Sequence, residues 1–381
     1  MRALIVINAP IIGGAEKHSF GLAAGLVAEG WACEVFAMRG GPLAAPVGVV
    51  LDSPALSAPY APAHRILDLA QRLRRERFDA LVCVNERPIL VGFLARLLAR
   101  IGVPLIGVSH TSILRTRSEK LWNLLYSPLM NRADAIVFIS RIQRDLWRAR
   151  GLRPRHETVI LNGIDMSAFS LAGRAQLRSA TRAHLGIAPS DFVIGSLAVF
   201  RPEKNISQLI EAVAELRRRG RPAKALLVGD GPMRPTIEQK ARELGIEAHV
   251  VFAGAQGDVR PFIAAFDVGV LCSTAIETLS LAALEMLGAG TPVVMSDIGG
   301  AREIVNGENG SVFAVGDTGV LVSLLERFEA LVKRDGFAEA TRASVVGKFD
   351  HPKMVAAYRD FLTDLVKSRR TGDIPSAFNV A

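Results

Sequence analysis

The stretch VGVLCSTAIETLSLAALEMLGAGTPVVMSD (268–297) contains two short apolar runs separated by a helical pattern. VGVLCS (268–273) and TPVVMSD (291–297) predict strands, and such continuous apolar runs are typical of parallel strands covered on both faces. Between them, TAIETLS indicates a loop that opens a helix, and LAALEMLGAG indicates the helix and its glycine stop. A strand, a helix and a strand in this order predict a βαβ unit.

The same alternation continues in both directions along the chain. Further strands are predicted at ALIVIN, CEVFAM, VGVVLD, DALVCV, PLIGVSH, AIVFIS, FVIGSLAVF, ALLVGD and HVVFAG. Helical patterns such as AHRILDLAQRLRRE lie between most of them, and ISQLIEAVAELRRRG repeats apolar residues at helical spacing. We therefore predict an α/β chain with two Rossmann-like, doubly wound domains facing across a cleft.

The domain boundary is expected where the pattern pauses. VILNGID (159–165) resembles a strand that ends in a turn, and a polar stretch follows it before the pattern restarts. The predicted parts are an N-terminal domain, a C-terminal domain, a helix that crosses back to the first domain and a flexible tail, over 1–165, 166–348, 349–370 and 371–381.

Composition narrows the class of protein. The chain has 381 residues, 50% hydrophobic and 22% charged, which is enough for two packed domains. Cys33, Cys83 and Cys272 are scattered and form no CxxC pair, so a disulfide framework or zinc ribbon is disfavoured and a reducing compartment is favoured. There is no HExxH and no Asp-x-Asp, and we expect neither a metal nor a cofactor.

The apolar segments do not predict a membrane span. MRALIVINAPIIGG is interrupted by Asn8 and Pro10 and reads as a strand that enters a glycine-rich turn, not as a signal peptide. The apolar region 88–108 carries Arg96 and Arg100, which breaks a span. The expected location is the cytoplasm, with peripheral contact at the inner face of the cell membrane.

The net charge of +9 lies in one part of the chain. Residues 1–163 hold 21 Lys and Arg against 12 Asp and Glu, while the remainder holds 25 of each. Such a face attracts an anionic membrane or an acidic substrate, although an Arg-rich solvated surface gives the same count. Aromatic residues are only 6% and are not interleaved with the basic ones, which disfavours nucleic acid.

Two carboxylates mark a candidate site at the carboxyl end of the strand 268–273. Glu277 precedes the predicted helix, near the amides of Leu279, Ser280 and Leu281, which form a favourable site for phosphate. Glu277 can accept hydrogen bonds from sugar hydroxyls, and Glu285, eight positions later, can bind a further diol such as a ribose.

Cations and glycines complete this set. RPEKN supplies Arg201 and Lys204 after a predicted strand, and Gly13 and Gly14 between a strand and a helix let a ligand approach the backbone. Together these residues fit a nucleoside diphosphate sugar. Each has a simpler reading when taken alone, because an acid at a helix start complements the dipole and a lysine is most often solvated.

The order of motifs resembles the retaining glycosyltransferases of family 4, which have the GT-B fold and belong to the group 1, RfaB-like transferases. The resemblance rests on the Glu-x7-Glu pair with EMLGAGTPVVMSDIGGAREIV, and on GGAEKH, ADAIVFIS, VILNGID, RPEKN, LLVGDGP, VVFAG and NGENGSVF. It covers about residues 1–320.

The resemblance implies a role for each matching position. In the first domain, Gly14 faces the diphosphate and His110 lies near the reacting centre, where we favour positioning over general-base catalysis. In the second, the implied roles are leaving-group stabilisation by Lys204, sugar binding by Glu277, phosphate binding by the amides of Ser280 and Leu281, ribose binding by Glu285 and proximity of Ala255 to the base.

Two positions depart from the family pattern. The family's arginine, five positions before the lysine, is replaced by Val199, and Arg201 is the candidate substitute. The family's usual EGFG is ETLS here, so Thr278 and Ser280 add side chains to the sugar pocket.

The resemblance implies metal-independent, retaining transfer of a hexose-type sugar from a nucleotide donor, UDP favoured over GDP, to an acceptor hydroxyl in cell-envelope glycolipid or polysaccharide synthesis. The acceptor would be a sugar, a lipid-linked intermediate or another small molecule, and the basic RLRRERF segment or the 112–132 region would contact the membrane. Alternatives are a degenerate transferase that binds without turnover and a GT-B sugar-nucleotide epimerase. A nicotinamide-dependent dehydrogenase is disfavoured because no G-x-G-x-x-G follows the first strand.

Overall fold

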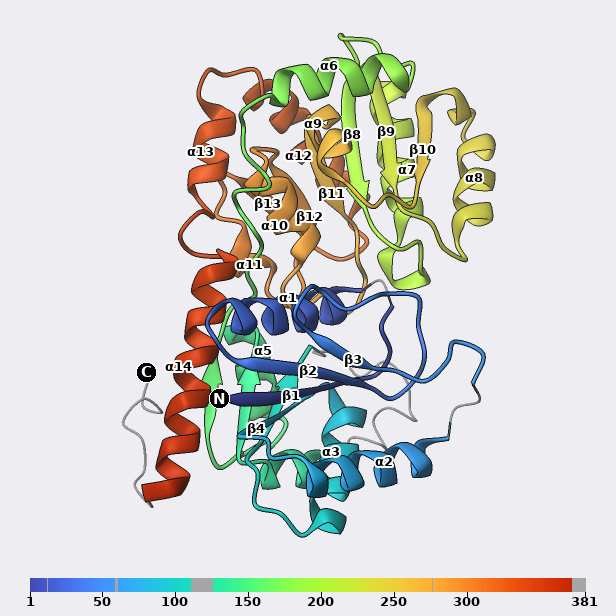
Figure 1. The fold of residues 1–381 in the computed structure, drawn as a ribbon. Coiled ribbons are helices and arrows are strands. Elements are labelled where there is room, and N and C mark those ends of the chain that lie inside the picture. Colours follow the sequence, from blue (N-terminus) through green and yellow to red (C-terminus); the bar gives the residue numbers. More distant parts are fainter. Residues whose placement is uncertain (12, 59–60, 111–125, 276, 372–381) are drawn as a thin grey trace. The chain divides into compact units, whose positions relative to one another are not determined.

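The chain forms two compact units, drawn as ribbons in Figure 1. The first comprises Met1–Gly163 and the segment that begins at His351, and the second is Ile164–Asp350. This computed structural model describes residues 1–11, 13–58, 61–110, 126–275 and 277–371.

The first unit is built on a seven-stranded parallel sheet in the order β3-β2-β1-β4-β5-β6-β7. Strand order reverses beside β1, which is where ligands bind in open α/β sheets. The strands are β1 Arg2–Ile7, β2 Ala32–Ala37, β3 Val50–Asp52, β4 Ala80–Val84, β5 Leu105–Ser109, β6 Ala135–Phe138 and β7 Glu157–Val159. The helices are α1 Gly14–Ala28, α2 Pro62–Arg75, α3 Glu86–Ala99, α5 Arg141–Ala149 and α14 His351–Thr371.

Helix α14 packs on α1 because two glycines of α1 leave room for it. A Cβ at Gly21 would lie 3.1 Å from Nε2 of His351, and one at Gly25 would overlap Val355. Tyr358 and Leu362 of α14 are fully buried in this unit. The segment after residue 350 therefore completes the core of the first unit.

The second unit has a six-stranded parallel sheet in the order β10-β9-β8-β11-β12-β13. Its strands are β8 Phe192–Leu197, β9 Ala223–Val228, β10 Val250–Gly254, β11 Val268–Leu271, β12 Val293–Ser296 and β13 Gly310–Phe313. Its helices are α6 Arg174–His184, α7 Ile206–Arg218, α8 Arg234–Glu243, α9 Arg260–Ala265, α10 Leu281–Gly288, α11 Ala301–Ile304, α12 Thr318–Leu331 and α13 Phe337–Ala343, with 3₁₀ turns η1 Pro202–Lys204 and η2 Glu247–His249.

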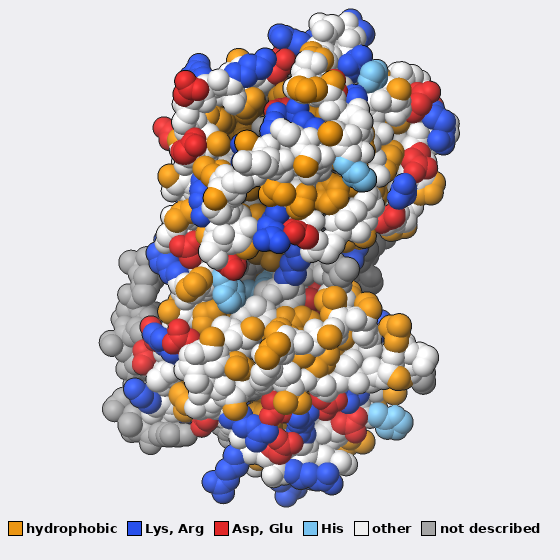
Figure 2. Space-filling view, turned by 45° about the horizontal axis from the view of Figure 1, so that its top comes forward, with side chains coloured by type: hydrophobic (Ala, Val, Ile, Leu, Met, Phe, Trp, Pro, Cys, Tyr) orange, Lys and Arg blue, Asp and Glu red, His pale blue; other side chains and the backbone are white. Residues whose placement is uncertain are grey.

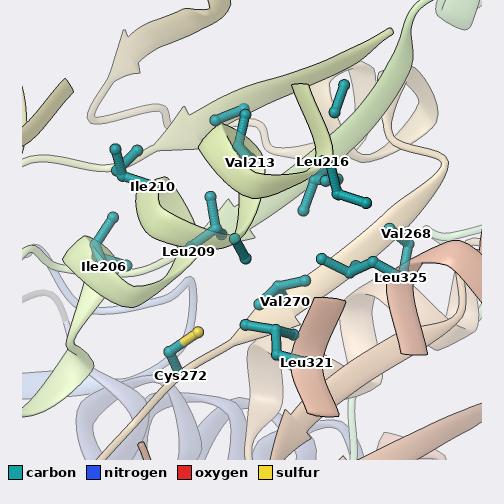
Figure 3. Close-up of a cluster of buried hydrophobic side chains, with 14 of the residues drawn as sticks. Ile206, Leu209, Ile210, Val213, Leu216, Val268, Val270, Cys272, Leu321 and Leu325 are labelled. Carbon is teal, nitrogen blue, oxygen red and sulfur yellow. The ribbon is translucent and has the colours of Figure 1, made fainter. Parts of the chain in front are cut away.

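The core of the second unit confirms the helical spacing predicted for 206–216. Figure 3 shows side chains of α7 in one buried cluster with side chains of β11 and α12, which include Val268, Val270, Leu321 and Leu325. The α7 residues involved are Ile206, Leu209, Ile210, Val213 and Leu216, each at most 4% exposed. Gly220, with φ +76°, follows the helix end.

The sequence prediction was wrong at two strands. VILNGID is not a strand over 159–165, because β7 ends at Val159 and the segment then carries only an isolated bridge between Ile164 and Asp350. Its polar Asn162-Gly163 turn cannot continue a ladder. The edge strand β13 was missed because NGENGSVF carries glycine and asparagine signals over most of its length.

Other expectations concern the membrane, the cysteines and the tail. Among the described residues, the structure contains no helix that is both long enough and apolar enough to span a bilayer. Cys33, Cys83 and Cys272 are free and buried, and burial raises the pKa of each thiol. The tail predicted over 371–381 lies outside the described residues, apart from its first position.

Candidate active site

Lys204 and Glu277 form an ion pair at the carboxyl edge of the second unit's sheet. Lys204 ends η1, which follows β8, and Glu277 follows β11. Glu277 is 7% exposed and the ammonium of Lys204 donates to its Oε1. The structure thus places Lys204, one of the two cations singled out from the sequence, beside Glu277. A buried carboxylate is stable only with such a partner.

Two further contacts hold this pair in place, and neither was predicted from the sequence. The hydroxyl of Ser273 donates to Oε1 of Glu277 at 2.8 Å, and the amide of Thr274 donates to the carbonyl of Glu203 at 2.8 Å. The second bond ties the loop after β11 to η1. Ser273 could have been found from its place at the carboxyl end of the predicted strand 268–273, where polar residues line α/β sites.

Helix α10 begins where the sequence analysis expected an anion site. Ser280 is its N-cap, with the hydroxyl accepting from the amide of Ala283 at 3.3 Å, and Leu281 is its first residue. The first amides of a helix have no intrahelical partner, and the dipole makes this end positive. Glu285 lies one turn inside the helix and is 8% exposed, which excludes the simple reading of a solvated surface acid.

The backbone of Glu277 rests on a glycine that the sequence analysis passed over. Gly299 has φ +54°, and a Cβ there would overlap the carbonyl oxygen of Glu277. The amide of Gly300 donates to the carbonyl of Thr278 at 2.7 Å. The signal was present in the sequence as DIGG after the strand 293–296, because adjacent glycines permit close backbone approach.

Arg201 and Ala255 lie at the surface of the second unit. Arg201 is exposed, and none of the ion pairs given by the described residues includes it. Val199, at the family's arginine position, is partly buried. Ala255 is exposed directly after β10, whose final residue Gly254 has φ +72°.

In the first unit, Gly13 and Gly14 form the start of α1. Gly13 is the N-cap with extended backbone, and a Cβ on Gly14 would meet nothing within 4 Å. The backbone conformations of Gly13 and Gly14 do not require glycine. A glycine is needed at these positions only if a ligand occupies the open space beside Gly14. The glycines therefore stay candidates for ligand approach.

His110 follows β5 and is held through its backbone. Its amide donates to Oδ1 of Asn85 at 2.9 Å, and Nε2 of Gln143 donates to the carbonyl of Ser109 at 2.9 Å. Asn85 itself has φ +72°. Burial of the ring lowers the pKa of His110 well below its usual value, and charge on His18 would lower it further. The imidazole is therefore neutral at physiological pH.

His18 is a neighbour of His110 that the sequence analysis did not identify. The two ring centroids lie 4.7 Å apart at an interplanar angle of 65°, and His18 is 4% exposed. Burial lowers the pKa of His18 to about 4, with the charge of His351 in the same direction. The sequence signals were its place at the end of the GGAEKH motif and its polar side chain in a predicted helix.

Among the described residues no cluster of three or more His, Cys, Asp or Glu side chains is arranged to hold a metal ion. The candidate groups are thus carboxylates, cations, amides and neutral histidines, distributed over the two units.

Two family models match the chain in succession. The model for Glycosyltransferase Family 4 matches residues 12–168, and the model for Glycosyl transferases group 1 matches residues 178–343. The solved structure of Anabaena HepE in complex with UDP-glucose has a TM-score of 0.80, with 23% identity over 95% of this chain and 99% of that one. This likeness shows the GT-B fold.

Curated relatives include enzymes of different pathways. The N-acetyl-alpha-D-glucosaminyl L-malate synthase of Bacillus anthracis is 27% identical over 80% of each chain. The lipopolysaccharide core biosynthesis glycosyltransferase LpsE of Rhizobium meliloti is 34% identical over 51% of this chain and 56% of its own. This chain belongs to the group 1 glycosyltransferases of family 4, which use nucleotide-sugar donors.

Proposed function

We propose that this glycosyltransferase moves a hexose-type sugar from a UDP-sugar to an acceptor hydroxyl, with retention at the anomeric carbon, in the synthesis of a cell-envelope glycolipid or polysaccharide. The observation that carries the proposal is the Lys204–Glu277 pair beside the first turn of α10. UDP is favoured because HepE was solved with UDP-glucose, and an envelope acceptor because LpsE acts in lipopolysaccharide core synthesis.

The chemistry follows from charge. As the donor's sugar–phosphate bond breaks, negative charge builds on the leaving diphosphate. The Lys204 ammonium and the amides at the start of α10 are preorganised to stabilise it. Glu277 accepts hydrogen bonds from sugar hydroxyls, and Glu285 binds the ribose. Gly14 and His110 contribute from the first unit, and Arg201 replaces the family's missing arginine.

A thermal-shift panel with UDP, GDP, ADP, their sugar conjugates and NAD, with and without EDTA, tests the donor. A ligand at 100 times its dissociation constant stabilises the folded state by about 2.7 kcal/mol. We expect a shift with UDP and UDP-sugars that EDTA leaves unchanged. Glu285→Ala should abolish it, while Glu329→Ala should not, because Glu329 is a comparably buried helical acid, 7% against 8% exposed, that pairs with Arg221 instead.

Turnover separates the enzyme from its closest alternatives. Release of sugar from the preferred donor, with an α-linked product from an α-linked donor, supports retaining transfer. Binding without transfer or hydrolysis would indicate a degenerate transferase, for which Val199 is the motivating residue. Conversion of the free donor into its epimer would indicate an epimerase.

Contact with an anionic membrane is proposed for one end of the first unit. Leu97 and Leu98 of α3 are 65% and 45% exposed, and the guanidinium of Arg74 donates to the carbonyl of Leu98. Arg100 follows them in sequence, and Arg75 and Arg77 are exposed at and just after the end of α2, which packs on α3. Figure 2 shows Lys and Arg side chains interspersed with Asp and Glu side chains along the lower edge of this unit. Apolar side chains ringed by cations suit an anionic lipid surface.

The membrane proposal involves RLRRERF, whereas most of the alternative region, 112–132, lies outside the described residues. Co-sedimentation with phosphatidylglycerol vesicles at low salt should be lost in a Leu97→Ser/Leu98→Ser double variant. Leu177→Ser, at a leucine 40% exposed on the second unit, should leave it unchanged. Absence of co-sedimentation by the parent protein would refute the proposal.

A further inference from the structure

The ring of His18 contacts two other rings. It makes the edge-to-face contact with His110 at 4.7 Å. It also lies beside Tyr358 of α14, with ring centroids 5.5 Å apart and an interplanar angle of 59°. His18 is 4% exposed and Tyr358 is fully buried, so both rings belong to the interior of the first unit.

The surroundings of His18 are polar, yet no strong hydrogen bond fixes its ring. Neither ring nitrogen makes a hydrogen bond of normal geometry within the described residues, although Asn162 lies close enough to favour the protonated form slightly. Within the same residues, Oδ1 of Asn162, the Tyr358 hydroxyl and Nε2 of His351 are also buried without a partner. Hydrogen bonding therefore does not explain why a histidine occupies this place.

Packing supplies the missing constraint. Gly21 and Gly25 let α14 approach α1 closely, which brings the ring of Tyr358 against His18. The buried ring of His18 has few rotamers available, because protein interiors are packed as densely as organic crystals. The contact between the two rings then limits the orientations that the His110 imidazole can adopt.

We propose that His18 is a positioning residue that holds the imidazole of His110 in one orientation through their edge-to-face contact. The inference rests on the proposed function, because it takes His110 to act at the reacting centre. It assigns His18 no contact with the substrate. It also gives α14 a role in the site, since the ring of Tyr358 in that helix lies against His18.

A double-mutant cycle tests whether His18 acts through His110. His18→Leu should lower kcat roughly two- to tenfold with the donor KM unchanged, the range that an aromatic pair contributes. His18→Phe keeps the ring and should retain most of that activity. In a His110→Ala background, His18→Leu should have no additional effect, because the residue that it positions is gone.

Phe20→Leu is the matched control, since Phe20 is a buried ring on the same helix at 8% exposure. It should lower the melting temperature but not kcat. Equal effects of His18→Leu in both backgrounds, or a loss in His18→Phe as large as in His18→Leu, would overturn the inference.

A readout independent of turnover separates this inference from the proposed function. The ¹⁵N signals of the His110 ring, assigned by loss of its peak in His110→Ala, should move or broaden in His18→Leu and stay near their parent positions in His18→Phe. Unmoved signals in both variants would refute the positioning role even in an active enzyme. If the parent protein consumes no sugar nucleotide, the proposed function fails, whatever these signals do.

Discussion

Gly299 lies directly against the backbone carbonyl of Glu277, so closely that any side chain at position 299 would overlap it. The contact restrains the backbone of the loop after β11 at Glu277. It thereby restrains the position of the Glu277 carboxylate, which pairs with Lys204. Among the glycines that the structure describes, Gly299 has the closest approach of a Cβ position to backbone, and it acts on the candidate site through the backbone of Glu277.

Gly299→Ala should weaken donor binding at least tenfold, because the loop that carries Glu277 must move to accept a methyl group. The positive φ adds a strain of order 1 kcal/mol. Gly307→Ala is the control, since Gly307 has φ +85° but nothing within 4 Å of its Cβ position. It should lose stability from strain alone and bind the donor normally, as measured by titration calorimetry. Equal affinity in the two variants would contradict the explanation.

Lys204→Ala should slow turnover by about ten- to a hundredfold, because a charge-assisted hydrogen bond is worth roughly 1.5–3 kcal/mol. The substitution also leaves Glu277 buried without its cation. Lys240→Ala removes a lysine of the same unit that pairs with Glu211 on the surface, and its kcat should not change. Steady-state kinetics with the sugar nucleotide that stabilises the protein in the thermal-shift panel measures the effect, and a fully active Lys204→Ala would exclude leaving-group stabilisation by this residue.

Gly25→Ala should destabilise the protein by about 1–3 kcal/mol although alanine is the better helix former, because the methyl group overlaps Val355. Gly319→Ala, in α12, should instead be neutral or stabilising by up to about 1 kcal/mol, since its Cβ would meet only Asp317 at 3.6 Å. Urea unfolding of the two variants gives the comparison. A Gly25→Ala variant at least as stable as the parent protein would show that α14 tolerates separation from α1.

Stability should fall as the pH is lowered from about 6.5 towards 4. His18 has a pKa of about 4 in the folded state, whereas an unfolded histidine titrates near its ordinary value of 6.5. Between these values the unfolded chain binds more protons, so protonation favours unfolding, by at most about 3 kcal/mol. His18→Phe should reduce the slope of the melting temperature plotted against pH over this range. An unchanged slope would mean that His18 is not the group responsible.

The sequence predicted most strands because a parallel sheet covered on both faces demands continuous apolar runs, as in Val268–Leu271. Strand prediction failed where the pairing of a strand depends on the strands beside it and not on its own composition. Strand β13 lies at an edge and is rich in polar and glycine signals. The run at 159–165 is apolar at first, but it pairs only up to Val159.

The site was predictable where a residue's type and its place after a strand carried the information. That was enough to single out Lys204 and Glu277, which the structure brings together. Gly299 and His18 were harder to predict because their importance comes from contacts with residues far along the chain. Local spacing patterns cannot reveal that residue 299 contacts residue 277, or that residue 18 contacts residue 110.

Helix α14 has a consequence for how the chain is made. The second unit is continuous, so it can fold as soon as residue 350 has left the ribosome. The first unit is synthesised earlier but lacks α14, and the face of α1 at Gly21 and Gly25 stays uncovered until then. Nascent chains often fold their N-terminal part first. Here the N-terminal unit cannot complete its core until α14 has been synthesised. A chaperone that binds exposed apolar helices would therefore find the uncovered face of α1 available for longer than any surface of the second unit.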